Sequence, residues 1–258
     1  MKKIVKKGFF AVLTFSLLFT ACISMHNDVA DRSTFNVIST EQEIEMGNEA
    51  YQEILAKETV SKNPVDIARV DAVSKRLIQA VGDDMQQADW KFSVIESDQI
   101  NAFALPGGKV VIYTSLLHII NDHELAYVLG HEIAHVTCHH GSERMSQQLL
   151  IQLGAVAIQA AAGKKSPEKT NAFLAAYGIG AQVGISLPFS RKNEYEADRI
   201  GLRYAVRAGY NAEASISTLR KFEEMNNGAA MPEFLSTHPL DAARIAALEK
   251  EIAEHYQK

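Results

Sequence analysis

The polar and apolar residues from 41 to 81 recur with the spacing of two amphipathic helices. Ser39 and Thr40 precede acidic residues, which is typical of a helix start, because hydroxyls cap the first turn and acids favour the positive end of the helix dipole. We predict one helix from residue 41 to about residue 57 and a second from about Val65 to Val81. The apolar face of the second helix comprises Ile67, Val70, Val73, Leu77 and Ile78.

The pattern changes to that of β-strands between residues 90 and 113. Residues 90–95 alternate between polar and apolar side chains, and residues 109–113 form a second run rich in β-branched residues. Between these runs lies an extended segment closed by a turn signal, Asn101-Ala102-Phe103-Ala104-Leu105-Pro106-Gly107-Gly108. The sequence therefore predicts an α+β fold, mostly helical, with a small sheet.

Helical spacing returns after Ser115 and continues to the C-terminus. Asn121 or Asp122 caps a helix predicted to extend to about His140, and later helices are predicted at residues 192–208, 212–226 and 239–256. Two Ala- and Gly-rich apolar stretches, 149–162 and 172–189, are typical either of a membrane hairpin or of buried helices. The glutamines within or beside them favour buried helices.

Residues 1–21 have the features of a secretory signal peptide, with a basic start, a short apolar run and small residues at the end. Leu18-Phe19-Thr20-Ala21-Cys22 resembles a bacterial lipobox, in which the cysteine becomes the lipidated first residue, although Phe19 stands where leucine is usual. The alternative is a plain secretion signal in which Cys22 is incidental. We expect a tether over residues 22–40 and one domain over residues 41–258. Ile23 offers no acidic retention signal, which favours the outer membrane over the inner one.

The composition adds few constraints. Hydrophobic residues make up 47% of the 258 residues, and the net charge of -5 is spread along the chain. No basic stripe suggests a nucleic-acid partner. The two cysteines, Cys22 and Cys138, lie in such different contexts that no disulfide is expected between them, and Cys138 is predicted to be a small buried apolar residue.

The sharpest chemical signal is His131-Glu132-Ile133-Ala134-His135 on a predicted helix. Histidines four positions apart lie one turn apart on the same face, so both imidazoles can reach a single metal ion. Glu132 projects near the same point, where it can take a proton from a metal-activated water. His139 and His140 lie off this stripe, so capping or packing is expected of them.

A catalytic zinc site also needs a third protein ligand and an open fourth position. Glu194 and Asp198 are four positions apart on a later helix, and Gly201 follows on the same face. Glu194 is the candidate ligand, Asp198 can hold the outer N–H of a ligand histidine, and Gly201 would allow close approach of the two helices. The alternative is that these acids merely solvate a helix face.

Four motifs, taken together, resemble peptidase family M48. They are the His131-to-His135 motif, Phe189-Ser190-Arg191-x-x-Glu194-x-Glu196-Ala197-Asp198, Ser236-Thr237-His238-Pro239, and the segment from Asn101 to Gly108 before the metal helix. The resemblance spans about residues 41–245, and the lipobox points towards its periplasmic lipoproteins.

The resemblance implies a zincin-type fold and hydrolysis of peptide bonds. Together with the composition, it also implies that residues 149–189 cover the cleft as a lid. It implies one zinc ion per chain, bound by His131, His135 and Glu194, with Glu132 as the catalytic acid and base. Substrate polypeptide would dock as an extended strand beside Asn101, Ala102, Phe103 and Ala104.

His238 is assigned to the site by the same resemblance, with two roles left open. It can restrain activity as an extra metal ligand, or donate a hydrogen bond to the tetrahedral intermediate. Arg244 is a candidate partner for a site carboxylate.

The expected function is hydrolysis of misfolded or partly folded proteins of the bacterial cell envelope by a lipid-anchored, periplasm-facing enzyme. The alternative is an assembly factor for outer-membrane proteins with latent proteolysis, acting with outer-membrane assembly partners. Zinc hydrolysis of a non-peptide substrate is a third, less supported reading, because the extended segment suits a polypeptide.

Overall fold

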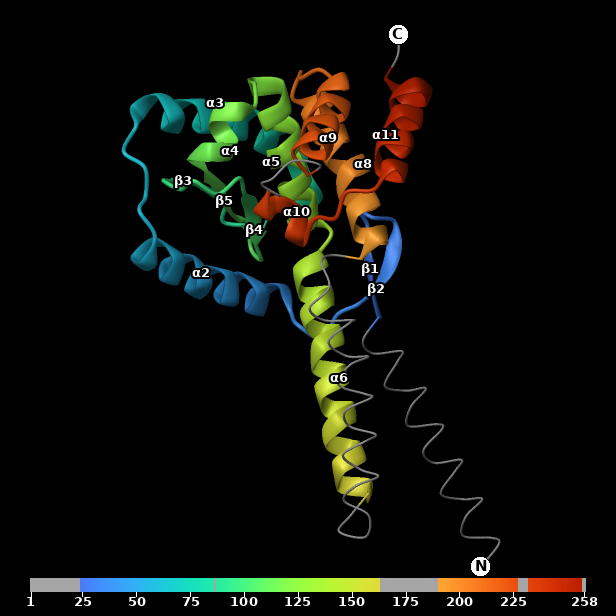
Figure 1. The fold of residues 1–258 in the computed structure, drawn as a ribbon. Coiled ribbons are helices and arrows are strands. Elements are labelled where there is room, and N and C mark those ends of the chain that lie inside the picture. Colours follow the sequence, from blue (N-terminus) through green and yellow to red (C-terminus); the bar gives the residue numbers. More distant parts are fainter. Residues whose placement is uncertain (1–23, 86, 163–189, 227–231, 257–258) are drawn as a thin grey trace, which may run out of the picture.

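The computed structural model describes residues 24–85, 87–162, 190–226 and 232–256, and helices surround a small sheet in it (Figure 1). The mostly helical α+β class predicted from the sequence is confirmed. The predicted signal peptide and Cys22 lie outside the described residues, as does the part of the predicted lid from 163 to 189.

The main sheet has three strands, β3 (Lys91–Ile95), β4 (Ala102–Leu105) and β5 (Lys109–Tyr113), in the order β3-β5-β4. β5 is parallel to β3 and antiparallel to β4, so β4 lies at one edge. Every residue of β5 is buried, as expected for a central strand covered on both faces. The sequence predicted both runs and the extended segment that forms β4.

Two layers of helix cover this sheet. On one face, α2 (Thr40–Lys57) packs Tyr51 against Val111 and Tyr113. On the other, α3 (Pro64–Val81) and α5 (Asp122–Thr137) share a core with β3 and β5 (Figure 1). The short helices η1 (Gly82–Met85) and α4 (Thr114–Ile119) follow α3 and β5, respectively. The core therefore lies between the sheet and α5.

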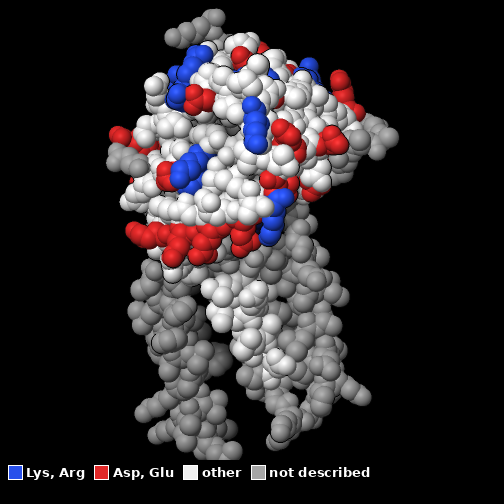
Figure 2. Space-filling model, turned by 90° about the vertical axis from the view of Figure 1, so that its left-hand side faces the viewer, with Lys and Arg blue, Asp and Glu red and all other residues white. Residues whose placement is uncertain are grey.

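The exposed side of α2 is acidic. Its exposed glutamates recur at every fourth position, and Figure 2 shows acidic side chains gathered along the lower edge of the body, where α2 lies. They are Glu41, Glu45, Glu49 and Glu53. This periodicity is the polar half of an amphipathic helix whose other half faces the sheet.

Four C-terminal helices complete the body: α8 (Arg191–Arg207), α9 (Glu213–Asn226), α10 (Glu233–Thr237) and α11 (Ala242–His255). The helix α5 is enclosed by its neighbours, because every residue from Glu124 to Thr137 is buried. A capping box between Asn121 and Glu124 starts α5, and Ser190 caps α8. The five-residue helix α10 was not predicted.

The chain between α5 and α6 differs from the prediction. α5 ends at Thr137, and α6 (His140–Ala162) begins three residues later as one helix that projects from the body (Figure 1). His139 has a φ of 56°, a left-handed conformation that turns the chain between the two helices. Among the described residues, no helix combines the length and the apolar character needed to cross a bilayer.

Part of the expected tether is structured. Residues 24–27 (β1, Ser24–Asn27) and 32–35 (β2, Arg32–Phe35) pair as an antiparallel hairpin, which we call the N-terminal hairpin. Asn27 Nδ2 donates a hydrogen bond to the carbonyl of Thr137 at the end of α5. Ala30 in its turn packs into the core, and polar contacts hold its two strands against the domain. The hairpin was not predicted, because its strands have no alternating apolar pattern.

Candidate active site

The central helix α5 supplies the first two candidate ligands. His131 and His135 lie one turn apart, and their Nε2 atoms are 3.1 Å from each other. Both side chains are almost completely buried. Because α5 is packed on all sides, the two imidazoles project into a fixed, enclosed space.

Helix α8 supplies a carboxylate to the same point. Glu194 Oε1 is 3.5 Å from His135 Nε2, and Glu194 Oε2 is 3.5 Å from His131 Nε2. This approach depends on two glycines where α5 and α8 cross: a Cβ on Gly130 would lie 2.7 Å from the carbonyl oxygen of Gly201. The close approach predicted for Gly201 is therefore present.

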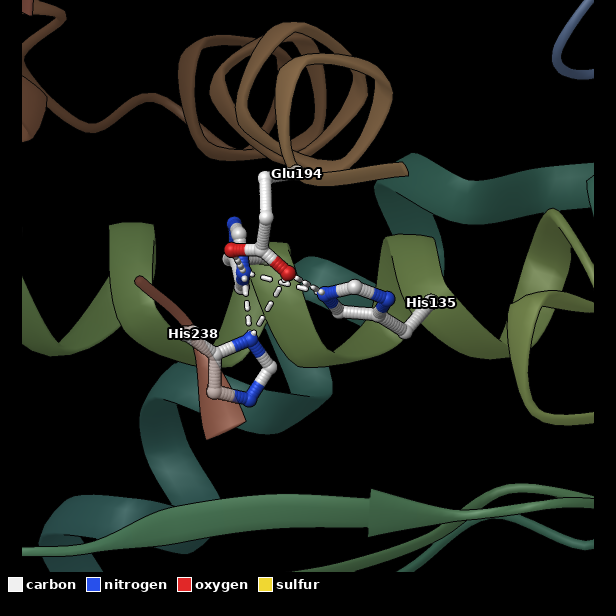
Figure 3. A group of neighbouring side chains, drawn as sticks. His135, Glu194 and His238 are labelled. Atoms are coloured by element: carbon white, nitrogen blue, oxygen red, sulfur yellow. Dashed lines mark hydrogen bonds and ion pairs between the residues drawn. The ribbon is translucent and has the colours of Figure 1, made fainter. Parts of the chain in front are cut away.

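A fourth donor comes from the end of α10. His238 Nδ1 is 3.3 Å from His131 Nε2 and 3.2 Å from Glu194 Oε1. Figure 3 shows the side chains of His135, Glu194 and His238 converging from three separate segments. One ligand atom from each of His131, His135, Glu194 and His238 lies within 4.8 Å of the others.

These donors fit a metal ion. His131 Nδ1 lies 3.0 Å from Asp198, and His135 Nδ1 lies 2.9 Å from His140. If both Nδ1 atoms carry the ring proton, the two Nε2 atoms point bare lone pairs at each other, which a cation between them would stabilise. Without a cation, burial lowers the pKa of both rings. The hydrogen bonds to Asp198 and Glu194 nevertheless raise that of His131 to about 9, while that of His135 stays low.

Arg244 holds the carboxylates in place. Its Nη1 lies 2.7 Å from Glu194 Oε2, and its Nε and Nη2 donate to Asp198 at 2.7 and 2.6 Å. Burial would raise the pKa of Asp198, but Arg244 and His131 lower it to about 2. The carboxylate of Asp198 therefore stays ionised beside His131, as expected of a group that orients a ligand. The pairing expected for Arg244 is confirmed.

Glu132 lies between the metal cluster and β4. Its Oε2 accepts a hydrogen bond of 2.9 Å from the backbone N–H of Ala104, and its Oε1 is 3.4 Å from His238 Nε2. Burial raises the pKa of Glu132. A buried carboxylate with a raised pKa is a better proton acceptor than an exposed one, so the position suits a general base.

The four residues predicted to bind substrate lie in β4 or directly before it, and they differ in burial and in the direction that their backbone groups face. Asn101 accepts a backbone hydrogen bond from Tyr113, so its carbonyl faces β5. Ala102 is fully buried, and the Phe103 ring meets Tyr113 edge to face on the side of α2. Because backbone groups in a strand alternate in direction, the N–H of Ala104 faces the free edge, where it meets Glu132.

Of two residues just after α5, His140 differs from its predicted role and Cys138 agrees with it. His140 was expected to cap or pack, yet its ring contacts the metal-ligand candidate His135 directly. The turn at His139 directs His140 back towards α5, and helical offsets from His135 do not apply across a turn. Cys138 is buried, and burial raises the pKa of its thiol to about 12, which agrees with an apolar packing role.

A buried helix with paired histidines and an intervening glutamate, joined by a glutamate from a second helix, defines the class of metallopeptidases built on a HExxH helix. The chain belongs to Peptidase family M48, whose family model matches residues 64–252. Membership of this family implies a metal cofactor.

Among its relatives is the Beta-barrel assembly-enhancing protease of Yersinia pestis, which is 33% identical over 218 residues, covering 81% of this chain and 43% of the relative. The human mitochondrial metalloendopeptidase OMA1 is 30% identical over 263 residues, covering 96% of this chain and 50% of the relative. The OMA1 protein of Schizosaccharomyces pombe is 32% identical over 233 residues, covering 88% of this chain and 66% of the relative. The chain thus spans about half the length of the curated relatives it matches.

Proposed function

We propose that this protein is a zinc-dependent endopeptidase that cleaves misfolded or partly folded proteins of the cell envelope. The observation that carries the proposal is the position of Glu132, buried beside the four converging donors and in contact with the free edge of β4. A protein that only binds other proteins has no need for such a carboxylate.

Each residue of the cluster has a distinct role in this proposal. His131, His135 and Glu194 would hold the ion, and Asp198 orients His131. Bound zinc would supply an activated water and polarise the scissile carbonyl. Glu132 accepts a proton from the attacking water and returns it to the leaving amine, a role that its raised pKa supports.

Substrate would add to the sheet along β4. β4 lies at the edge of the sheet, and a strand edge pairs with extended polypeptide through main-chain hydrogen bonds. The N–H of Ala104 on this edge donates to Glu132, so a substrate strand that pairs there would replace Glu132 as its acceptor. Such pairing tolerates varied side chains, which suits unfolded substrates. An Ala104→Pro variant, which lacks this N–H, should lose cleavage, whereas Ala104→Ser retains the N–H and should stay active.

His238 completes the cluster as a fourth donor, and we propose that it restrains hydrolysis. Three protein ligands with an open position are typical of catalytic zinc sites, whereas four closed ligands are typical of structural ones. The Nδ1 atom of His238 lies 3.3 Å from His131 Nε2 and 3.2 Å from Glu194 Oε1, close enough to compete with water for the fourth position.

The setting of the enzyme is also part of the proposal. The lipobox at Cys22 supports a lipid anchor on the periplasmic side of an envelope membrane, with the outer membrane favoured by Ile23. The Yersinia pestis relative is named for β-barrel assembly, which supports the second candidate function, an assembly factor with latent proteolysis and outer-membrane assembly partners.

The decisive test is cleavage of casein, an unfolded protein, by the zinc-loaded protein and by Glu132→Gln. Glu49→Gln, on the exposed face of α2, is the matched control. We expect cleavage by the wild type and by Glu49→Gln, and none by Glu132→Gln at equal zinc content. If neither the wild type nor Glu132→Gln cleaves while both bind zinc, the assembly function is favoured and the enzymatic proposal fails under these conditions.

A further inference from the structure

A continuous series of polar contacts runs from the metal-ligand candidate His135 to the N-terminal hairpin. His135 Nδ1 lies 2.9 Å from His140 Nδ1, and His140 Nε2 lies 3.1 Å from Glu196 Oε2. Arg32 Nε then donates to both carboxylate oxygens of Glu196, at 2.7 and 2.8 Å. The remaining nitrogens of Arg32 donate to both oxygens of Glu143, at 2.9 and 2.8 Å.

The chemistry of each group fixes the direction of these hydrogen bonds once His135 binds metal through Nε2. The Nδ1 of His135 then carries a proton and donates it to His140. Because His140 accepts at Nδ1, its own proton is on Nε2, which donates to Glu196. An ionised Glu196 only accepts, and Arg32 only donates. All four groups are satisfied in this arrangement, so the series favours the tautomer of His135 that leaves Nε2 available to a metal ion.

The side chains of this series are buried, and burying charged groups costs desolvation free energy. His140 is fully buried, and the side chains of Arg32, Glu143 and Glu196 are between 11% and 13% exposed. Replacing a buried ion pair by apolar residues of similar volume is often neutral or stabilising, so stability alone is a weak reason for such a network. The carboxylates on both sides of Arg32 raise its pKa further, so it remains charged.

Beyond His135, the series joins three elements that are distant from one another in the sequence: α6, α8 and β2. His140 and Glu143 belong to the first turn of α6, Glu196 lies on α8 two residues after Glu194, and Arg32 belongs to β2 of the N-terminal hairpin. Asn27, also in the hairpin, bonds to the end of α5. The hairpin therefore contacts three of the helices near the cluster: α5, α6 and α8.

We propose that His140, Glu196 and Arg32 are positioning residues for the metal ligand His135, and that the N-terminal hairpin is thereby a part of the metal site. This inference rests on the proposed metal site. It assigns His135 a supporting partner equivalent to the one that Asp198 provides for His131. Supporting groups of this kind fix the orientation of a ligand ring and raise its basicity, and their loss typically lowers metal affinity by about 10–100-fold.

The test measures zinc affinity by competition with a chromophoric chelator, on the full chain. The variants are Arg32→Gln, Glu196→Gln and His140→Leu. Arg69→Gln is the matched control, because Arg69 also holds a carboxylate but lies far from the metal cluster. It donates hydrogen bonds to the carboxylate of Asp122 and to the backbone carbonyls of Leu117 and Ile120. We expect affinity to fall by about 10–100-fold in the three variants and to stay unchanged in Arg69→Gln.

Two further measurements separate positioning from a general loss of stability. Substitution by Co²⁺ should give an altered visible spectrum in the three variants but the wild-type spectrum in Arg69→Gln. In the double variant of Arg32→Gln with His140→Leu, affinity should fall no further than in His140→Leu alone, because His140 is the link through which Arg32 acts.

Three results would contradict one of the two proposals. Wild-type affinity and spectrum in Glu196→Gln, the most conservative change, would overturn the proposal even if Arg32→Gln failed to fold. Additive losses in the double variant would also contradict it. A wild-type protein that binds no zinc would instead refute the proposed function, so failure of the two proposals can be told apart.

Discussion

Gly201 of α8 lies so close to α5 that a Cβ in its place would be 2.6 Å from the backbone nitrogen of His131. The contact is between backbones, and no flexible side chain can move away to make room. Because Glu194 is on the same face of α8, the distance between these two helices sets the distance between Glu194 and the two histidines.

We therefore expect Gly201→Ala to separate α8 from α5. Overpacking of this kind costs about 1–3 kcal/mol of unfolding free energy, and zinc affinity should fall with it. Gly141→Ala is the control, since a Cβ there would make an ordinary contact of 3.4 Å with Pro106. Chemical denaturation and zinc titration measure both effects, and wild-type values in Gly201→Ala would contradict this account of the helix crossing.

Arg244 is the second support of the cluster, and it pairs with Glu194 and Asp198 while only 1% exposed. Its replacement by glutamine would leave two buried carboxylates without their cation. Removing one partner of a buried ion pair costs about 3–5 kcal/mol, so Arg244→Gln should unfold at much lower denaturant concentration than the wild type.

The exposed pair of Arg220 and Glu249 provides the control for Arg244. Arg220→Gln should change stability by no more than about 1 kcal/mol, because exposed ion pairs contribute little. Equal effects of the two substitutions would show that burial does not govern the contribution of Arg244.

A pH dependence should arise at the start of α5. Burial would raise the pKa of Glu124, but Lys221, the backbone N–H of Asn121 and the hydroxyl of Ser217 together lower it. A carboxyl whose pKa is lower in the folded state stabilises the fold above its ordinary pKa, near 4.3, and this contribution is lost as the pH falls further.

We expect the metal-free wild type to lose stability below about pH 4.3, and Glu124→Gln to lose less over the same range. The two proteins should differ most at neutral pH and converge in acid. Glu223→Gln, on the exposed side of α9, is the control and should follow the wild type. Parallel curves for the wild type and Glu124→Gln, from thermal unfolding at several pH values, would contradict the assignment.

Much of the site was predictable because helical spacing is a local property. His131 and His135 are brought together by one helix, and Glu194 with Asp198 by another. That the two helices meet was expected from Gly201 and from the family resemblance. The strands of the main sheet were also predicted, since the β5 run and the turn at Gly107 and Gly108 are local signals.

The parts that were missed depend on long-range contacts. The N-terminal hairpin has no apolar alternation, and ion pairs of Arg32 with residues more than 100 positions away hold it in place. The contact of His140 with His135 depends on a left-handed residue, His139, which is not a glycine and gives no turn signal. A histidine pair directly after a metal-binding helix was the only local sign of it.

His238 lies between the metal-ligand candidates and the general base. Its Nδ1 lies with the metal-ligand atoms, and its Nε2 is 3.4 Å from Glu132 Oε1, so one ring touches both the cluster and the general base. As a fourth ligand it would compete with water for the open position, and a site without that position hydrolyses slowly. His238→Ala should therefore bind zinc more weakly but cleave casein with a higher kcat/KM when zinc is saturating.

His118→Ala is the control for this substitution, because His118 is half-exposed and pairs with Asp66 far from the cluster. It should match the wild type in both zinc affinity and cleavage. A lower kcat for His238→Ala at full zinc occupancy would assign His238 the other role, that of a hydrogen-bond donor to the tetrahedral intermediate, because loss of such a donor slows the chemical step without removing the metal. Since the two roles predict opposite changes in kcat, initial rates over a range of casein concentrations, which give kcat apart from KM, distinguish them.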